Sequence, residues 1–147
     1  MEGLRSNLRE ISRQEFDSLL TLANSNHVVV RALEIFFNIT REAKDDIRAE
    51  WAQTALADER ARITTALRFL EVICTIFGDE KLDLVAIKSL DHWPDFGSDI
   101  DLYTNANSED IAELMKKRFD ARVDPSTPVP AHVTEYRLPG SRGERGA

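Results

Sequence analysis

The sequence predicts an α+β protein in which a helical N-terminal half precedes a short region of β-strands. Between residues 41 and 77 the chain has neither proline nor glycine, and its apolar residues recur at helical spacing. After Gly78 the pattern changes, and residues 99–104 read D-I-D-L-Y-T, an alternation typical of a strand with two different faces. We therefore expect a helical subdomain over 1–78, an α/β core over 79–138 and a disordered tail over 139–147.

The helical half should contain three segments. Ser12 and Glu15 have the spacing of a capping box, which predicts that the first helix begins here and ends at the polar run 24–26. The second segment, over 28–39, is apolar almost all round, which is usual for a helix at the centre of a bundle. The third segment is either one long helix or two helices broken near residues 57–58.

The sequence contains one cysteine and three histidines. Cys74 lies in an apolar stripe of the third helical segment, so we expect a packed, unreactive thiol. A single cysteine can form neither an intrachain disulfide nor a multi-cysteine zinc site. The histidines are widely separated in sequence and are expected to be surface or capping residues. They are His27, His92 and His132.

Charge and hydropathy disfavour two classes of partner. The 147 residues include 19 basic and 26 acidic side chains, a formal net charge of −7. Bulk binding to nucleic acid requires a basic face, so we do not expect it here. No apolar run reaches the roughly 18 residues of a membrane span, and the charged N-terminal sequence is unlike a signal peptide. We expect a cytoplasmic protein with no membrane partner.

Acidic residues are concentrated around the predicted D-I-D-L strand. Residues 89–115 contain seven acids and no lysine or arginine. Asp99 and Asp101 are two apart on the predicted strand, so both carboxylates should leave one face while Ile100 and Leu102 point to the core. Two such carboxylates suit Mg²⁺, which completes its coordination with water and substrate phosphates. The alternative is purely structural, with a turn acceptor followed by a solvated strand residue.

Two neighbouring motifs resemble a known family. The run 85–89, Val-Ala-Ile-Lys-Ser, is followed ten residues later by Asp-Ile-Asp-Leu at 99–102. An apolar strand, a Gly/Ser pair and a D-x-D strand in this order resemble the DNA polymerase beta-like nucleotidyltransferase superfamily. The chain is most similar to an uncharacterised nucleotidyltransferase family, in which a helical segment precedes a strand ending in Lys-Gly and a D-I-D-L strand. The similarity extends over about residues 15–124.

The resemblance implies a fold, a reaction and a set of site residues. The helical subdomain would be followed by a small mixed β-sheet of nucleotidyltransferase type. Asp99 and Asp101 match the metal-binding aspartates, with Mg²⁺ as cofactor, and Glu135 would be the third catalytic carboxylate on a later strand. The reaction would be Mg²⁺-dependent transfer of a nucleoside monophosphate from an NTP to an acceptor hydroxyl. The nucleotide phosphates would meet Lys88, Ser89, Gly97 and Ser98.

The chain departs from the family at three points. Ser89 replaces the usual glycine, and Asp95 stands where an arginine often precedes D-I-D-L. Relatives also continue well beyond the strand of the third carboxylate. Two alternatives to an active enzyme therefore stay open. One is a non-catalytic or truncated nucleotidyltransferase-fold module that acts in binding or regulation, and the other is a fragment of a longer protein.

Overall fold

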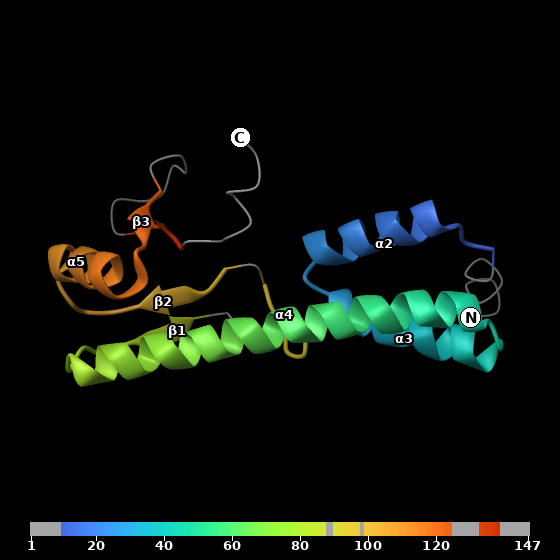
Figure 1. Ribbon diagram of the computed structural model, residues 1–147, viewed down its shortest axis with the longest axis horizontal. Coiled ribbons are helices and arrows are strands. Elements are labelled where there is room, and N and C mark those ends of the chain that lie inside the picture. Colours follow the sequence, from blue (N-terminus) through green and yellow to red (C-terminus); the bar gives the residue numbers. More distant parts are fainter. Residues whose placement is uncertain (1–9, 88–89, 98, 125–132, 139–147) are drawn as a thin grey trace. The chain divides into compact units, whose positions relative to one another are not determined.

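The computed structural model describes residues 10–87, 90–97, 99–124 and 133–138. Within them the chain is mainly helical, with two small antiparallel strand pairs, and is α+β in this broad sense (Figure 1). It divides into two compact units, Met1–Tyr103 and Thr104–Ala147. Predictions outside the described residues concern Lys88, Ser89, Ser98, His132 and the tail 139–147.

The first unit contains the three expected helices, α2 (Arg13–Ser25), α3 (Val29–Glu42) and α4 (Asp46–Asp79). The capping box at the start of α2 is confirmed. The Glu15 backbone N–H donates to Ser12 Oγ at 3.3 Å, and the Ser12 N–H donates to Glu15 Oε2 at 2.7 Å. The α4 helix is continuous over 34 residues, which decides for one long helix over two.

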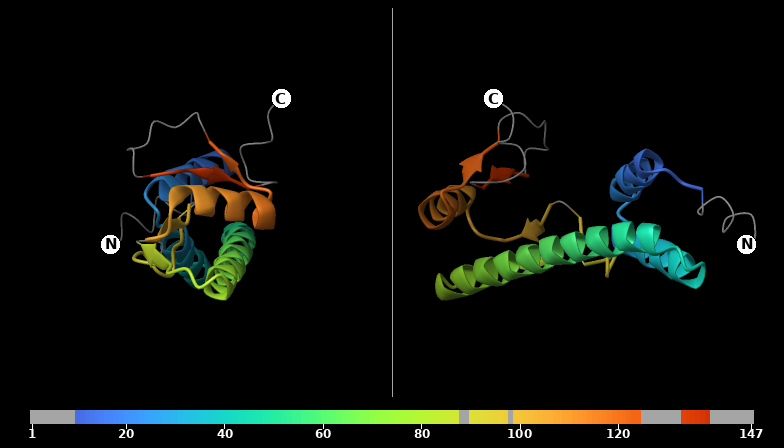
Figure 2. Two further views of the ribbon diagram at one scale, coloured as in Figure 1. Left: turned by 90° about the vertical axis from the view of Figure 1, so that its left-hand side faces the viewer. Right: turned by 45° about the vertical axis from the view of Figure 1, so that its right-hand side comes forward.

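The α3 helix contacts both α2 and α4, in agreement with the central position predicted for it. Because α4 is much longer than α3, its C-terminal half extends beyond that helix (Figures 1 and 2). The buried core cluster draws on all three helices and on one residue of the loop 90–97. Its members are Phe16, Val30, Leu33, Phe36, Ala52, Leu56, Ile63 and Phe96.

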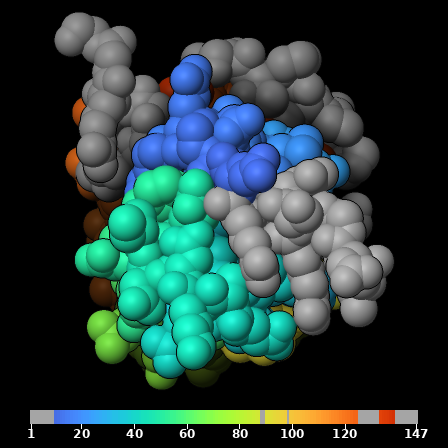
Figure 3. Space-filling view, turned by 90° about the vertical axis from the view of Figure 1, so that its right-hand side faces the viewer, coloured from blue at the N-terminus to red at the C-terminus, as the bar shows by residue number. Residues whose placement is uncertain are grey.

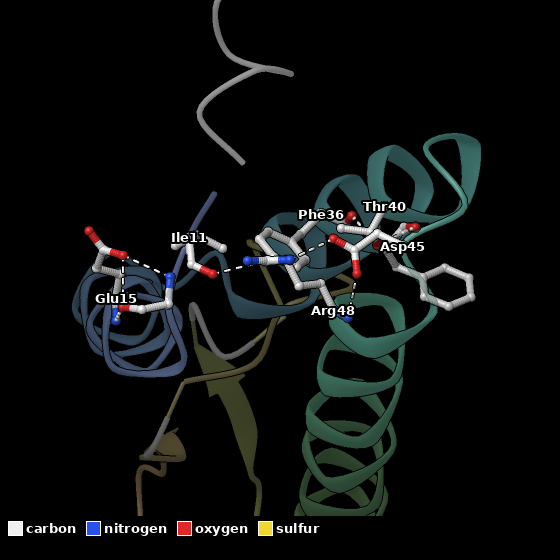
Figure 4. Close-up of polar contacts among 8 residues, drawn as sticks. Ile11, Glu15, Phe36, Thr40, Asp45 and Arg48 are labelled. Atoms are coloured by element: carbon white, nitrogen blue, oxygen red, sulfur yellow. Dashed lines mark hydrogen bonds and ion pairs between the residues drawn. The ribbon is translucent and has the colours of Figure 1, made fainter. Parts of the chain in front are cut away.

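Arg48 ties the start of α2 to the turn between α3 and α4 (Figure 4). Its Nε–H donates to the Ile11 carbonyl and its Nη1 to Asp45 Oδ2, both at 2.8 Å. The Asp45 carboxylate also caps α4 by accepting the Arg48 backbone N–H at 3.1 Å. Figure 3 views this end of the first unit, where the blue atoms of α2 lie against the turquoise atoms around the α3–α4 turn. One arginine therefore links the residues just before α2 to the start of α4.

The strands form two separate ladders in the part of the chain that is described. In the first unit β1 (Val85–Ile87) pairs antiparallel with β2 (Asp101–Tyr103). In the second unit β3 (Arg122–Val123) pairs antiparallel with β4 (Tyr136–Arg137). Neither ladder by itself has the mixed pairing that the resemblance implies, so the nucleotidyltransferase-type sheet stays a prediction. Parallel neighbours need a crossover, usually a helix, and the described residues between β1 and β2 include no helix.

Two burial predictions are wrong. The strand expected to be buried is exposed, with 56% of Val85 and 39% of Ile87 accessible to solvent. Apolar side chains suit a strand for burial, but a two-stranded ladder buries them only where another element packs on it. Cys74 is also exposed, whereas its neighbour Ile73 is buried. The two residues lie about 100° apart around the helix, so the face that buries Ile73 leaves Cys74 at the surface.

The described part of the second unit is a helix followed by the β3–β4 ladder. Helix α5 (Ser108–Phe119) is capped by Asn107, whose side chain accepts the Glu109 N–H at 2.8 Å. The helix ends at Asp120, which adopts a left-handed conformation with φ of 50°.

None of the helices in these ranges combines the length and the apolar character that crossing a membrane would need.

Candidate functional site

The D-I-D-L run has the predicted alternation. Asp99 and Asp101 are exposed, while Ile100 and Leu102 are half-buried, and Ile100 packs against the helical core. Asp99 lies in a bend just before β2, and Asp101 is the first residue of that strand. Only Asp101 lies within the strand, so the common direction predicted for the two carboxylates stays a prediction. The sequence therefore presents two carboxylates to solvent at the start of a strand that is held from behind by apolar contacts.

The antiparallel register brings the end of β1 to the start of β2. Ile87, the last residue of β1, is the partner of Asp101. Lys88 and Ser89 follow Ile87 directly in the sequence, and Ser98 precedes Asp99, but all three lie outside the described residues. Their predicted contacts with nucleotide phosphates stay predictions.

Arg62 on α4 holds the segment that leads into this strand. Its Nη2 donates to the Phe96 carbonyl at 2.5 Å and its Nη1 to the Gly97 carbonyl at 3.0 Å. The same guanidinium pairs with Glu59 through two bonds of 2.7 and 2.9 Å. The hydrogen bond with Glu59 raises the pKa of Arg62, against the opposing effect of burial. Gly97 is thus fixed by its carbonyl, two residues before Asp99.

Arg31 on α3 holds the other end of the same loop. Its Nη2 donates to the His92 carbonyl at 3.1 Å and to the Trp93 carbonyl at 2.8 Å. Its Nε lies 3.6 Å from Asp95 Oδ2. Arg31 and Arg62 thus attach the loop 90–97 to α3 and α4 through the backbone carbonyls of the loop.

Asp95 has a structural role at the position where the family often has arginine. It is only 2% exposed, and its Oδ1 accepts the Val30 backbone N–H at 2.5 Å. The N-cap residue of α3, Val28, has no side chain that can cap the helix. Asp95 therefore caps α3 from 65 residues away, where a carboxylate also offsets the positive end of the helix dipole.

Sequence reasoning missed the two arginines as part of this region. It found no basic residue near D-I-D-L closer than Lys88 and Lys116. In the fold, Arg31 and Arg62 reach the preceding loop from separate helices, across sequence separations of 34 to 62 residues. Both arginines lie within residues 15–124, the range over which the chain resembles the family.

Two histidines that the sequence treats as unrelated lie side by side. The His27 and His92 rings are stacked, with centroids 6.3 Å apart and an interplanar angle of 15°. Both residues are exposed, as expected for surface histidines. His27 lies in the turn between α2 and α3 with φ of 54°, a left-handed conformation for a residue other than glycine. The pairing connects this turn with the loop 90–97.

Glu135 belongs to the second unit, whereas Asp99 and Asp101 belong to the first. It is half-buried and directly precedes β4, and its carbonyl accepts the Asp124 N–H at 2.9 Å. Its role as third carboxylate stays a prediction. Within the four described ranges, no three or more histidine, cysteine, aspartate or glutamate side chains are gathered as a metal site.

Comparison with known proteins gave no match to this chain among family models, curated proteins or solved structures.

Proposed function

We propose that the chain is a nucleotidyltransferase-type protein whose Asp99 and Asp101 bind Mg²⁺ together with the phosphates of an NTP. The observation that supports this is the alternation along the D-I-D-L run, with two exposed carboxylates in front and apolar side chains behind. Carboxylate oxygens are the ligands that Mg²⁺ takes from proteins, usually one or two of them. The donor set therefore fits the ion.

The proposed reaction moves a nucleoside monophosphate to an acceptor hydroxyl. The acceptor oxygen forms a bond to the α-phosphorus, the bond from that phosphorus to pyrophosphate breaks, and the acceptor loses its proton. Bound Mg²⁺ would supply charge neutralisation for the triphosphate and the leaving pyrophosphate. Asp99 and Asp101 would hold the ion, and Glu135 would serve as the third acid. Contacts with phosphate would come from Lys88, Ser89, Gly97 and Ser98.

The proposal includes the finer fold assignment and the location. The β1–β2 hairpin would be the part of a nucleotidyltransferase-type mixed sheet that carries the D-x-D strand. The protein would act in the cytoplasm, on an NTP and a hydroxyl-bearing acceptor.

A second candidate is a non-catalytic module that binds nucleotide without transferring it. The observation that favours it is that charged side chains near the D-x-D strand bind other parts of the protein. Asp95 caps a helix, while Arg31 and Arg62 donate to loop carbonyls. The two arginines could stabilise a triphosphate in an active enzyme, but here they bind the protein's own backbone.

A thermal-shift titration tests the binding step that both candidates share. We expect Mg²⁺ with at least one of the four common NTPs to raise the Tm, because a ligand bound by the native state stabilises it. The rise should disappear in Asp99→Asn and in Asp101→Asn. Asp91→Asn, which removes an exposed acid from the same acidic segment, is the matched control and should respond as the original chain does.

The outcome separates the hypotheses. An unchanged Tm in the original chain, or an equal rise in all three variants, would rule out the aspartate pair as the site. Where binding is present, pyrophosphate release in the presence of hydroxyl acceptors distinguishes the enzyme from the binding module.

A further inference from the structure

The stacked pair His27 and His92 lies next to the backbone of the D-I-D-L run. A Cβ placed on Gly97 would be 4.0 Å from His27 Nδ1 and 3.9 Å from the Asp99 backbone N and O. His27 and Asp99 therefore border the same methyl-sized space. His92 extends this aromatic surface, because its ring is stacked with that of His27 at a centroid distance of 6.3 Å.

Hydrogen bonds hold the backbone that carries both rings. The His27 N–H donates to the Asn24 carbonyl at 3.2 Å, and the His92 carbonyl accepts a hydrogen bond from Arg31 Nη2 at 3.1 Å. Both side chains are exposed, so a ligand can reach them. Binding to a surface whose backbone is already ordered avoids the entropic cost of ordering a loop.

The geometry of the two rings favours a planar ligand over a metal ion. An imidazole nitrogen binds a metal through a lone pair that lies in the plane of the ring. The planes of this stacked pair are inclined by only 15°, so they do not direct two nitrogens at one ion. The faces of the rings, in contrast, can stack on a further aromatic ring.

A third exposed aromatic side chain belongs to the same loop. Trp93 follows His92 directly, and 55% of its surface is accessible, although tryptophan is highly buried on average. Its carbonyl accepts a hydrogen bond from Arg31 Nη2 at 2.8 Å, so this part of the loop is held as well. Histidine and tryptophan are side chains on which nucleic-acid bases stack. Among planar ligands, the exposed aromatic residues therefore favour a base.

We propose that the His27–His92 pair binds the base of the NTP whose Mg²⁺ and phosphates lie at Asp99 and Asp101. This inference rests on the proposed function and adds the location of the base. In an NTP the ribose separates the base from the α-phosphate, so a surface for the base has to lie beside the metal ligands rather than among them. His27 meets this condition because it borders the Asp99 backbone.

Calorimetric titration with Mg²⁺ present compares each of the four common NTPs with ribose 5-triphosphate, which has the sugar and the phosphates but no base. We expect the original chain to bind at least one NTP at least about fivefold more tightly than ribose 5-triphosphate, the smallest advantage typical of one stacked base. His27→Asn and His92→Gln should each remove most of this advantage without changing the affinity for ribose 5-triphosphate. Asparagine suits position 27 because it tolerates the left-handed backbone there.

His92→Phe is the matched variant, because phenylalanine keeps an aromatic face and loses the ring nitrogens. It should bind the NTPs as the original chain does. Since His27 and His92 are both exposed, we expect all three variants to keep the Tm of the original chain when no ligand is present.

Three results would overturn the base site and leave the proposed site for Mg²⁺ and triphosphate intact. They are equal affinity of the original chain for the NTPs and ribose 5-triphosphate, an advantage of the NTPs that survives both His27→Asn and His92→Gln, and a loss in His92→Phe as large as in His92→Gln. If no triphosphate binds at all, the proposed function is wrong, and the base site is wrong with it.

Discussion

Arg62 should contribute more to stability than any isolated surface arginine, because it fastens the loop before the D-x-D strand to α4. Replacing it by methionine keeps a long apolar side chain and a good helix former while removing every donor. The change abolishes the bonds to the Phe96 and Gly97 carbonyls and leaves Glu59 without its partner.

The size of the effect follows from the contacts. A hydrogen bond that involves a charged group contributes about 1.5–3 kcal/mol when it is well shielded. The Arg62 side chain is 28% exposed, so we take the lower end, about 1–1.5 kcal/mol for each of the two carbonyl bonds. Glu59, which is less exposed than Arg62, then carries an unpaired charge. We expect Arg62→Met to lower the free energy of unfolding by about 2–3 kcal/mol.

Urea denaturation measures this quantity, and Arg60→Met is the matched control on the same helix. Arg60 pairs with Glu34 at 2.8 Å, but its side chain is 58% exposed. An exposed pair contributes about 0–1 kcal/mol, so the control should lose less than about 1 kcal/mol. If the two variants differ by less than about 0.5 kcal/mol, Arg62 is an ordinary surface arginine and the argument for an anchored loop fails.

Other predictions address the core, the first helix cap and the second unit. Leu33→Ala should lower the free energy of unfolding by about 3 kcal/mol because Leu33 is buried in the core cluster, whereas Leu22→Ala, on an exposed face, should cost less than about 1 kcal/mol by the same urea assay. Hydrogen bonds from the backbone and side chain of Ser12 lower the pKa of Glu15, so the stability they add is present above the ordinary pKa and is lost as pH falls through the lowered one. Ser12→Ala should raise the pKa of Glu15 in an NMR titration, and an unchanged value would contradict the capping box. Burial raises the pKa of Tyr136, so absorbance should show its phenol ionising at higher pH in the folded chain than in urea.

The helices could be predicted from sequence because their signals are local. The capping box at Ser12 and the proline-free run after residue 41 each predict an element from a few neighbouring residues. The alternation of the D-I-D-L run is equally local, and the exposures of Asp99 and Ile100 follow it. These local signals do not show which side of an element is buried by its neighbours. Cys74 and the strand Val85–Ile87 are exposed, although their composition suggested burial.

The loop before the D-x-D strand could not be predicted because its contacts are distant in sequence. Asp95 caps a helix 65 residues earlier, and Arg31 reaches carbonyls 61 and 62 residues later. A single sequence carries no periodic signal for such pairs. The stacking of His27 on His92 was missed for the same reason.

These distant contacts change the interpretation of the acidic segment 89–115. Asp95 is offset by Arg31 and the N-terminus of α3, so it adds no charge to a cation site. Glu109 and Asp110 lie in the first turn of α5, where carboxylates offset the helix dipole. Much of the acidity that first suggested a cation site is therefore explained by helix termini. The hypothesis then depends on the two aspartates of the D-I-D-L run. Mg²⁺ and an NTP would have to bind there although Arg31 and Arg62 already donate to the carbonyls of the adjoining loop.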